Sequence, residues 1–165
     1  MTEWTQRAHV LADHAVSGVL GHVSSLHFDT MSELLWVGSA SGQLTSHTGA
    51  LPTLPRYTSL AAHGAPKQPR HVRGILSDDK FIISLSEGRV CASQRQGLGR
   101  WSMQIEDHAP GVALAGLCAS PQSASSDIIV GGAAPNSHDA LFALHSISGR
   151  VVRSAVSDGT VTQLR

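Results

Sequence analysis

Residues 28–46 read FDTMSELLWVGSASGQLTS, and this segment predicts three short strands joined by two turns. The first strand ends at Phe28, and the polar residues that follow can turn the chain. Leu34–Val37 is a continuous apolar run, which is typical of a strand buried on both faces. Gly42 lies in the second turn, where a positive φ is often required, and Leu44 begins the third strand. The segment is therefore expected to form a β-meander.

The same pattern occurs three times along the chain. The apolar second strands begin at Leu34, Phe81 and Ile128, which are 47 positions apart in both intervals. A period of about 40 to 50 residues with four short strands per repeat is typical of a β-propeller blade. The other strands are expected at residues 23–28, from 44 onward, 57–61, 72–76, 90–93, 101–105, 112–119, 141–145 and 151–156. The predicted fold class is all-β, an incomplete WD40-like β-propeller with about three four-stranded blades.

These strands divide the chain into segments. We expect an N-terminal segment (residues 1–22), a first blade (23–63), a second blade (64–108) and a third blade (109–156). Residues 157–165 contain a Gly-Thr-Val element like the third strand of a further blade, so we interpret them as its remnant. Closed propellers have about four to eight blades, and three blades leave sheet edges without a neighbour. We therefore expect a propeller that is either cut or missing a segment.

Length and composition limit the class of protein. A chain of 165 residues is long enough for one domain with its own core. Charged residues make up 15% and the formal net charge is zero, which excludes a global field that attracts nucleic acid or membranes. No run of about 18 apolar residues and no apolar signal segment occurs, so we expect a cytoplasmic protein without a membrane span. Cys91 and Cys118 lie in apolar strands without metal-ligand spacing, so buried reduced thiols are expected.

The residues that most often carry chemistry do not form a recognisable motif. The ten histidines are scattered without an HxxxH or HxH pair, so we expect solvated or loop histidines rather than zinc ligands. No G-x-S-x-G nucleophile elbow occurs, and a Ser/His/Asp triad stays open only because the chain is rich in serine. Trp36 and Trp101 are expected in blade cores rather than as stacking platforms. No Trp-Asp dipeptide closes a repeat, so the hydrogen-bonded network usual in WD40 repeats is not expected. We therefore assign no catalytic, cofactor-binding or metal residue.

One window of the sequence is basic. Residues 34–77 contain arginines and a lysine but no acidic residue. Lys67, Arg70 and Arg73 lie in or beside a loop rich in proline and glycine, where contact with phosphate groups is physically reasonable. Tyr57 is the one nearby aromatic side chain that could stack on a base. Two interpretations stay open: a solvated loop between blades, or a contact site for RNA or a protein partner at Lys67, Arg70 and Arg73.

The sequence of the first repeat is specific enough to point to a family. The elements that carry the likeness are FD at 28–29, SELLWVG at 32–38, SG at 41–42, LTS at 44–46, RYTS at 56–59, AH at 62–63, VR at 72–73, AS at 92–93 and Trp101. In these elements the chain resembles the N-terminal WD40 propeller of the catalytic subunit of the poly(A)-nuclease deadenylation complex. The resemblance covers about residues 20–160 and departs at residues 47–50, around Pro52 and in the tail.

The resemblance implies a function that the residues alone do not give. It implies a non-catalytic scaffold portion, for protein interaction, of a cytoplasmic poly(A)-specific 3′-exonuclease of mRNA decay and P-bodies. In that family a linker after the propeller binds a pseudokinase regulatory subunit, and a separate nuclease domain uses magnesium. No position here matches the nuclease motif, so this chain is not expected to be an enzyme, and no cofactor is expected in it. A poly(A)-bound protein is the second partner implied, and direct contact with RNA stays open.

Two alternatives to this function remain. The first is a generic WD40-like adaptor unrelated to RNA decay, which the fold alone would permit. The second is a truncated product without an independent function, which the missing strands before Gly159 favour.

Overall fold

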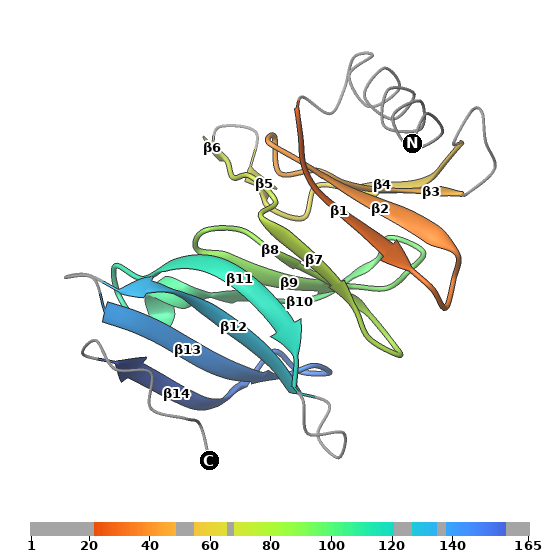
Figure 1. Ribbon diagram of the computed structural model, residues 1–165. Coiled ribbons are helices and arrows are strands. Elements are labelled where there is room, and N and C mark those ends of the chain that lie inside the picture. Colours follow the sequence, from red (N-terminus) through yellow and green to blue (C-terminus); the bar gives the residue numbers. More distant parts are fainter. Residues whose placement is uncertain (1–21, 49–54, 66–67, 121–126, 135–137, 158–165) are drawn as a thin grey trace, which may run out of the picture.

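Three antiparallel four-stranded sheets form the protein in the computed structural model, which describes residues 22–48, 55–65, 68–120, 127–134 and 138–157 (Figure 1). Blade 1 consists of β1 (Val23–Asp29), β2 (Leu34–Ser39), β3 (Leu44–Thr48) and β4 (Arg56–Leu60). Blade 2 consists of β7 (Gly74–Ser77), β8 (Ile82–Leu85), β9 (Arg89–Ser93) and β10 (Gly99–Gln104). Blade 3 consists of β11 (Ala113–Ala119), β12 (Asp127–Ala134), β13 (His138–His145) and β14 (Val151–Ser157). Each strand pairs with the next along the chain, as in propeller blades.

All twelve strands expected from the sequence are present, and the differences are local. The loop between blades 1 and 2 contains an unexpected pair of short strands, β5 (Gly64–Ala65) and β6 (Gln68–Pro69). A single 3-10 turn, η1 (Ile105–Asp107), follows β10. The prediction that a strand begins at Val72 was wrong by two residues, because the Val72 N–H donates to the Ser39 carbonyl of blade 1 instead of pairing with β8.

The three blades lie side by side around their first strands. β1 and β11 both lie against β7, and the later strands of each blade fan outward (Figure 1). The larger core fills the junction of blades 2 and 3, and its central side chains include Ile83, Leu85, Val90, Leu114, Val130, Phe142 and Leu144. A smaller core fills the junction of blades 1 and 2, and it includes Leu34, Trp36, Leu44, Val72 and Ile82. The apolar strands that the sequence predicted therefore supply the side chains that pack between neighbouring blades.

Backbone hydrogen bonds join neighbouring blades at equivalent positions. The Val72 N–H, ahead of blade 2, donates to the Ser39 carbonyl of blade 1 at 3.1 Å. The Leu114 N–H of blade 3 donates to the Glu87 carbonyl of blade 2 at 2.7 Å. Both acceptors lie at or just after the end of the second strand of their blades. The repeat in the sequence is thus matched by a repeat in how the blades are joined.

A buried ion pair closes the opposite end of the junction between blades 1 and 2. The Asp29 carboxylate, at the end of β1, accepts hydrogen bonds from the Arg95 guanidinium, and the exposed fractions of these side chains are 1% and 16%. Arg95 lies in the β9–β10 hairpin, and it also donates to the backbone carbonyls of Asp78 at 2.7 Å and Asp79 at 3.2 Å. This one side chain therefore connects the β1–β2 turn to two loops of blade 2.

The cysteine prediction is confirmed at one position and wrong at the other. Cys91 is buried, but Cys118 is exposed. Cys118 pairs with Ile129 on the face of blade 3 that points away from blade 2, whereas its neighbour Leu117 packs on the core. Alternation along β11 accounts for the difference, because successive side chains point to opposite faces of a strand.

Several expectations fall outside the described residues. The N-terminal segment lies there except for His22, and so does the remnant after Ser157. In the part of the chain that the structure describes, no helix has the length and hydrophobicity that a membrane crossing requires.

Candidate functional site

The structure brings two of the three predicted basic residues together in a cleft. Arg70 and Arg73 line a cavity of about 340 Å³ with His71 and Glu87. Lys67, the third predicted residue, lies outside the described residues. We call the cavity lined by Arg70, His71, Arg73 and Glu87 the basic cleft.

The basic cleft is built by the loop that leads from β6 into β7. The Arg70 N–H donates to the His63 carbonyl at 3.3 Å, which ties the start of this loop to the residue that joins blades 1 and 2. The Arg73 N–H donates to the Leu85 carbonyl at 2.7 Å, which ties its end to the second strand of blade 2. Gly88 allows the Arg70 guanidinium to approach the β8–β9 turn, since a Cβ at this position would meet Arg70 Nη1. The loop therefore directs both arginines toward the same turn of blade 2.

An acidic residue partly neutralises the cleft. Arg73 Nη2 lies 2.9 Å from Glu87 Oε2, and the side chains are 43% and 58% exposed. Such an exposed pair contributes at most about 1 kcal/mol to stability, and water and salt screen it. Sequence reasoning missed Glu87 because this residue follows the segment 34–77, which contains no acidic residue. Only the β8–β9 turn brings Glu87 back to Arg73. Arg70 and His71 are left to face solvent (both are exposed).

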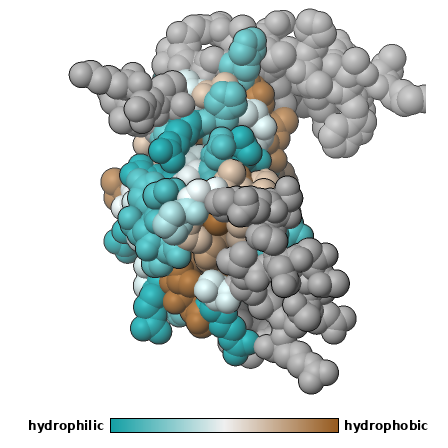
Figure 2. Space-filling view, turned by 90° about the vertical axis from the view of Figure 1, so that its left-hand side faces the viewer, coloured by the Kyte–Doolittle hydropathy of each residue, from teal (hydrophilic) through white to brown (hydrophobic). Residues whose placement is uncertain are grey.

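The surface around the cleft is polar. Figure 2 views the molecule from the side on which the β8–β9 turn lies, and hydrophilic side chains cover much of the described surface there. A polar surface with two arginines can hold a phosphate group or a carboxylate through charge-assisted hydrogen bonds. The geometry thus permits anion contact at Arg70 and Arg73.

The expectation that the histidines are solvated or loop residues was wrong for His27 and His47, which lie in strands. His47 is buried in β3, and His27 lies half-buried between β1 and β7. His27 Nε2 accepts from the Ser77 N–H at 3.1 Å and lies 2.8 Å from Ser77 Oγ. Burial lowers the pKa of His27, and the charge of Asp29 opposes this shift. The neutral ring therefore joins the innermost strands of blades 1 and 2.

His63 is a buried polar residue between blades 1 and 2. Its Nε2 lies 2.9 Å from Ser84 Oγ, and its Nδ1 lies 3.9 Å from Cys91 Sγ. Burial, together with the positive charges of Arg89 and Arg70, lowers the pKa of His63 to about 4. The hydrogen bond with Ser84 opposes this shift. A buried histidine–serine link between blades is therefore present, although the missing Trp-Asp dipeptides predicted no such network.

Cys91 beside this histidine is a structural thiol. Burial raises the pKa of Cys91 to about 11, although the charge of Arg89 opposes the shift. The thiol donates to the Ala62 carbonyl at 3.2 Å. A neutral imidazole next to a protonated thiol lacks the thiolate that a catalytic cysteine requires. Over the described ranges, no three His, Cys, Asp or Glu side chains come together as ligands for a metal ion.

Trp36 and Trp101 are confirmed as packing residues. Trp36 is completely buried in the junction of blades 1 and 2. Trp101 packs at the junction of blades 2 and 3, where its indole N–H donates to the Ser146 carbonyl at 2.7 Å. Gly149 has a φ of +68°, and a Cβ there would meet the Trp101 ring.

Comparison with known proteins gives a consistent family. The family model described as PAN2 N-terminal matches residues 8–138. A curated relative from Aspergillus clavatus, the PAN2-PAN3 deadenylation complex catalytic subunit pan2, is 34% identical over 143 residues, which are 86% of this chain and 11% of the relative. The protein of the same name from Aspergillus oryzae is 44% identical over 84 residues, which are 51% of this chain and 7% of the relative. The chain thus spans only about a tenth of the length of these curated relatives.

A solved structure agrees with this family. The Neurospora crassa Pan2 WD40 domain superposes with a TM-score of 0.68 and 26% sequence identity. The match covers 84% of this chain and 39% of that domain. The predicted fold class, a WD40-like β-propeller present in part, is therefore confirmed.

Proposed function

Because the chain belongs to the PAN2 N-terminal family, we propose that it forms the non-catalytic scaffold portion of a poly(A)-shortening 3′-exonuclease that acts in mRNA deadenylation and decay. The observation that carries this proposal is the family match over residues 8–138. It weighs against a generic adaptor unrelated to RNA decay. In this proposal the nuclease chemistry and its magnesium belong to parts of the relatives that the chain does not cover, and the chain holds no cofactor of its own.

The way the blades are joined supports a scaffold role. Apolar layers and backbone hydrogen bonds hold each blade to the next, and the Asp29–Arg95 pair adds a buried polar link. Such junctions keep surface loops at fixed distances from one another, which is what a partner-binding platform requires. The loops that carry Arg70 and Arg73 are anchored in this way at both ends.

The partners follow from the relatives. Curated relatives of this chain carry the name of a PAN2–PAN3 complex, so we propose that the protein works together with a PAN3-type pseudokinase subunit. A poly(A)-bound protein is the second proposed partner, and the cytoplasm, including P-bodies, is the proposed location. We assign the basic cleft, with Arg70 and Arg73, and Lys67 beside it in the sequence, as the first surface to test for contact with RNA or with such a partner.

A chimaeric enzyme tests the scaffold proposal. The segment of the Aspergillus clavatus relative that matches this chain is either deleted or replaced by this chain, and each protein is purified with its PAN3 subunit. The replacement is expected to keep the rate of poly(A) shortening on RNA coated with poly(A)-bound protein, and the deletion is expected to lower that rate. Equal rates for the intact and deleted enzymes on coated RNA would contradict the proposal, as would shortening of poly(A) by this chain alone.

Charge reversal tests the basic cleft separately. Arg70→Glu with Arg73→Glu is expected to weaken binding of the chimaeric enzyme to coated RNA by about tenfold at low salt, because two cationic contacts are lost. Arg150→Glu with Lys80→Glu changes the net charge equally at exposed residues outside the cleft and serves as the control. Unchanged affinity in the cleft variant, with Lys67→Glu added as well, would remove the cleft from the proposal and leave the scaffold role intact.

A further inference from the structure

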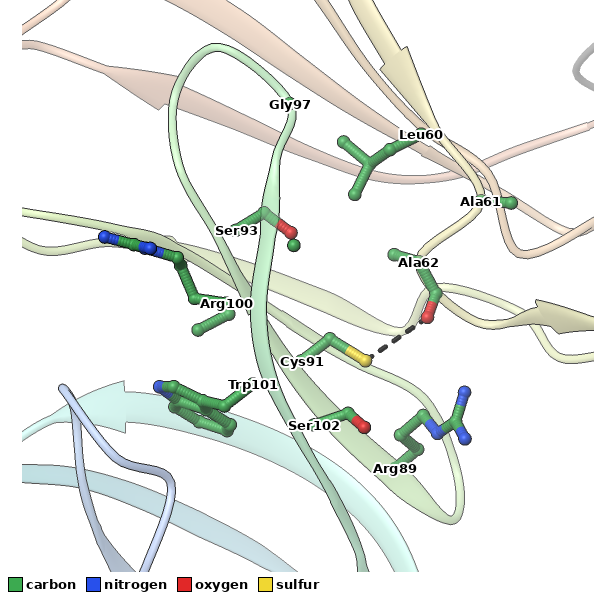
Figure 3. A pocket seen from close by; sticks show the side chains of 12 residues that line it. Leu60, Ala61, Ala62, Arg89, Cys91, Ser93, Gly97, Arg100, Trp101 and Ser102 are labelled. Carbon is green, nitrogen blue, oxygen red and sulfur yellow. Dashed lines mark hydrogen bonds between the residues drawn. The ribbon is translucent and has the colours of Figure 1, made fainter.

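A second cleft, between blades 1 and 2, has no part in the function proposed above. It encloses about 510 Å³ between the end of β4, at Leu60–Ala62, and the face of β9 and β10 (Figure 3). Pockets that bind small molecules or peptide side chains have volumes of about 300 to 1,000 Å³. We call this space the inter-blade cleft.

The inter-blade cleft exists because small side chains face each other there. Blade 2 contributes Cys91, Ser93 and Ser102, and blade 1 contributes Ala61 and Ala62. The core between blades 2 and 3 contains large side chains such as Met103 and Phe142 instead. Figure 3 shows the Leu60 side chain and the Ser93 hydroxyl directed into the space between β4 and the β9–β10 hairpin. The junction is therefore hollow at its outer part while its inner part is packed.

The lining of the cleft is positively charged. It contains Arg89 and Arg100 and no carboxylate among its described residues. Figure 3 shows Arg89 at one end of the space beside Ser102, whereas Arg100 extends away from it. Arg89 is half-buried, and its Nε lies 2.9 Å from the side-chain amide of Gln104, whose oxygen accepts when it is oriented toward the guanidinium. A guanidinium that is partly removed from water and paired with a neutral amide favours an anionic ligand.

The pKa of the buried His63, next to the cleft, is shifted by the same positive charge. Arg89 is the charged group that contributes most to lowering the pKa of His63, after burial itself. No acidic side chain opposes it among the causes of this shift. The charge of Arg89 therefore acts on the buried residues beside the cleft.

We propose that the inter-blade cleft binds an extended acidic peptide segment, with one carboxylate on Arg89 and small apolar side chains against Leu60 and Ala62. The exposed hydroxyl of Ser102 can bond to the peptide backbone, since it both donates and accepts. A nucleic-acid strand fits less well because Trp101, the aromatic residue in the lining, is held by other contacts. The Trp101 ring packs toward Gly149, and its N–H is bound to the Ser146 carbonyl.

Fluorescence anisotropy of a labelled peptide tests this proposal on the 165-residue chain. The probe is a decapeptide of alternating Glu and Ala, compared with a decapeptide of alternating Lys and Ala and with labelled oligoadenylate. The Glu/Ala peptide is expected to bind, and Arg89→Gln is expected to weaken it at least about tenfold because a charge-assisted hydrogen bond is lost. Arg150→Gln, at an exposed residue outside the cleft, is the matched control and is expected to leave the affinity unchanged.

A second variant keeps the test decisive if Arg89→Gln does not fold. Ser102 is exposed at the edge of the cleft, so Ser102→Glu places a negative charge there without burying it. This variant is expected to abolish binding of the Glu/Ala peptide and to retain the melting temperature of the parent chain. The proposal is overturned if the Glu/Ala peptide does not bind, if both cleft variants bind it as the control does, or if oligoadenylate binds more tightly through Arg89.

Discussion

Replacing Asp29 by asparagine is expected to remove a specific part of the acid sensitivity of this fold. Burial alone would raise the pKa of Asp29. Hydrogen bonds from Arg95, Ser32 and the Met31 N–H, with the charge of Arg95, outweigh burial and lower the pKa from 3.8 to about 2. Because the folded-state pKa lies below the unfolded one, the ion pair stabilises the protein above about pH 4, and this contribution is lost as the pH falls toward 2.

The size of the effect follows from the same shift. A pKa difference of this size corresponds to roughly 2 to 3 kcal/mol in the free energy of unfolding. At pH 7 the Asp29→Asn variant should lose about 3 kcal/mol, since it leaves the Arg95 guanidinium, only 16% exposed, without its carboxylate. The double variant Asp29→Asn with Arg95→Met should lose less than the sum of the single variants, because it removes both charges.

Urea unfolding at a series of pH values measures both effects. The parent chain should lose stability between pH 4 and pH 2 more steeply than Asp29→Asn, and the two curves should converge at the acid end. Parallel curves for parent and variant over this range would refute the assigned role of the ion pair. Arg150→Gln, at an exposed residue away from this ion pair, is the control that should leave the slope unchanged.

Three further changes test other parts of the structure. Gly149→Ala should destabilise the fold by more than about 1 kcal/mol in thermal unfolding, because φ is +68° and the new Cβ meets Trp101, whereas Gly99→Ala meets no atom within 4 Å and should have little effect. His63→Gln should flatten the dependence of the free energy of unfolding on pH between about pH 6.5 and pH 4. The reason is that a histidine whose folded-state pKa is lowered to about 4 makes the folded state less stable as the pH falls through this range. An unchanged pH dependence would contradict the burial of His63 as a neutral ring. Phe142→Ala should cost about 3 to 5 kcal/mol in urea unfolding, and a loss below about 1 kcal/mol would show that the layer between blades 2 and 3 is not the main core.

The strands could be predicted from the sequence because they depend on local pattern. Short apolar runs at a fixed interval, starting at Leu34, Phe81 and Ile128, identify the second strand of each blade. Turn residues such as Gly42, with a φ of +82°, mark where the strands reverse. The order of four strands then follows from the preference of consecutive strands to pair.

The contacts between blades could not be predicted in this way. Asp29 and Arg95 are 66 positions apart, and nothing in their local sequence marks them as a pair. His63 resembled a loop histidine until the fold placed it beside Ser84 and Cys91. Glu87 joins the basic cleft only through the β8–β9 turn, 14 positions after Arg73. Such contacts depend on how the blades lie against each other, which periodicity within one blade does not encode.

The solution behaviour of the isolated 165-residue chain tests most directly the claim that the blades form one rigid scaffold. Light scattering combined with thermal unfolding, followed by tryptophan fluorescence and by circular dichroism, gives the state of association and the number of transitions. We predict a monomer with one sharp transition at the same temperature for both signals, which Asp29→Asn and Phe142→Ala both lower as a whole. Aggregates, or separate transitions in which each variant moves only its own junction, would contradict the claim.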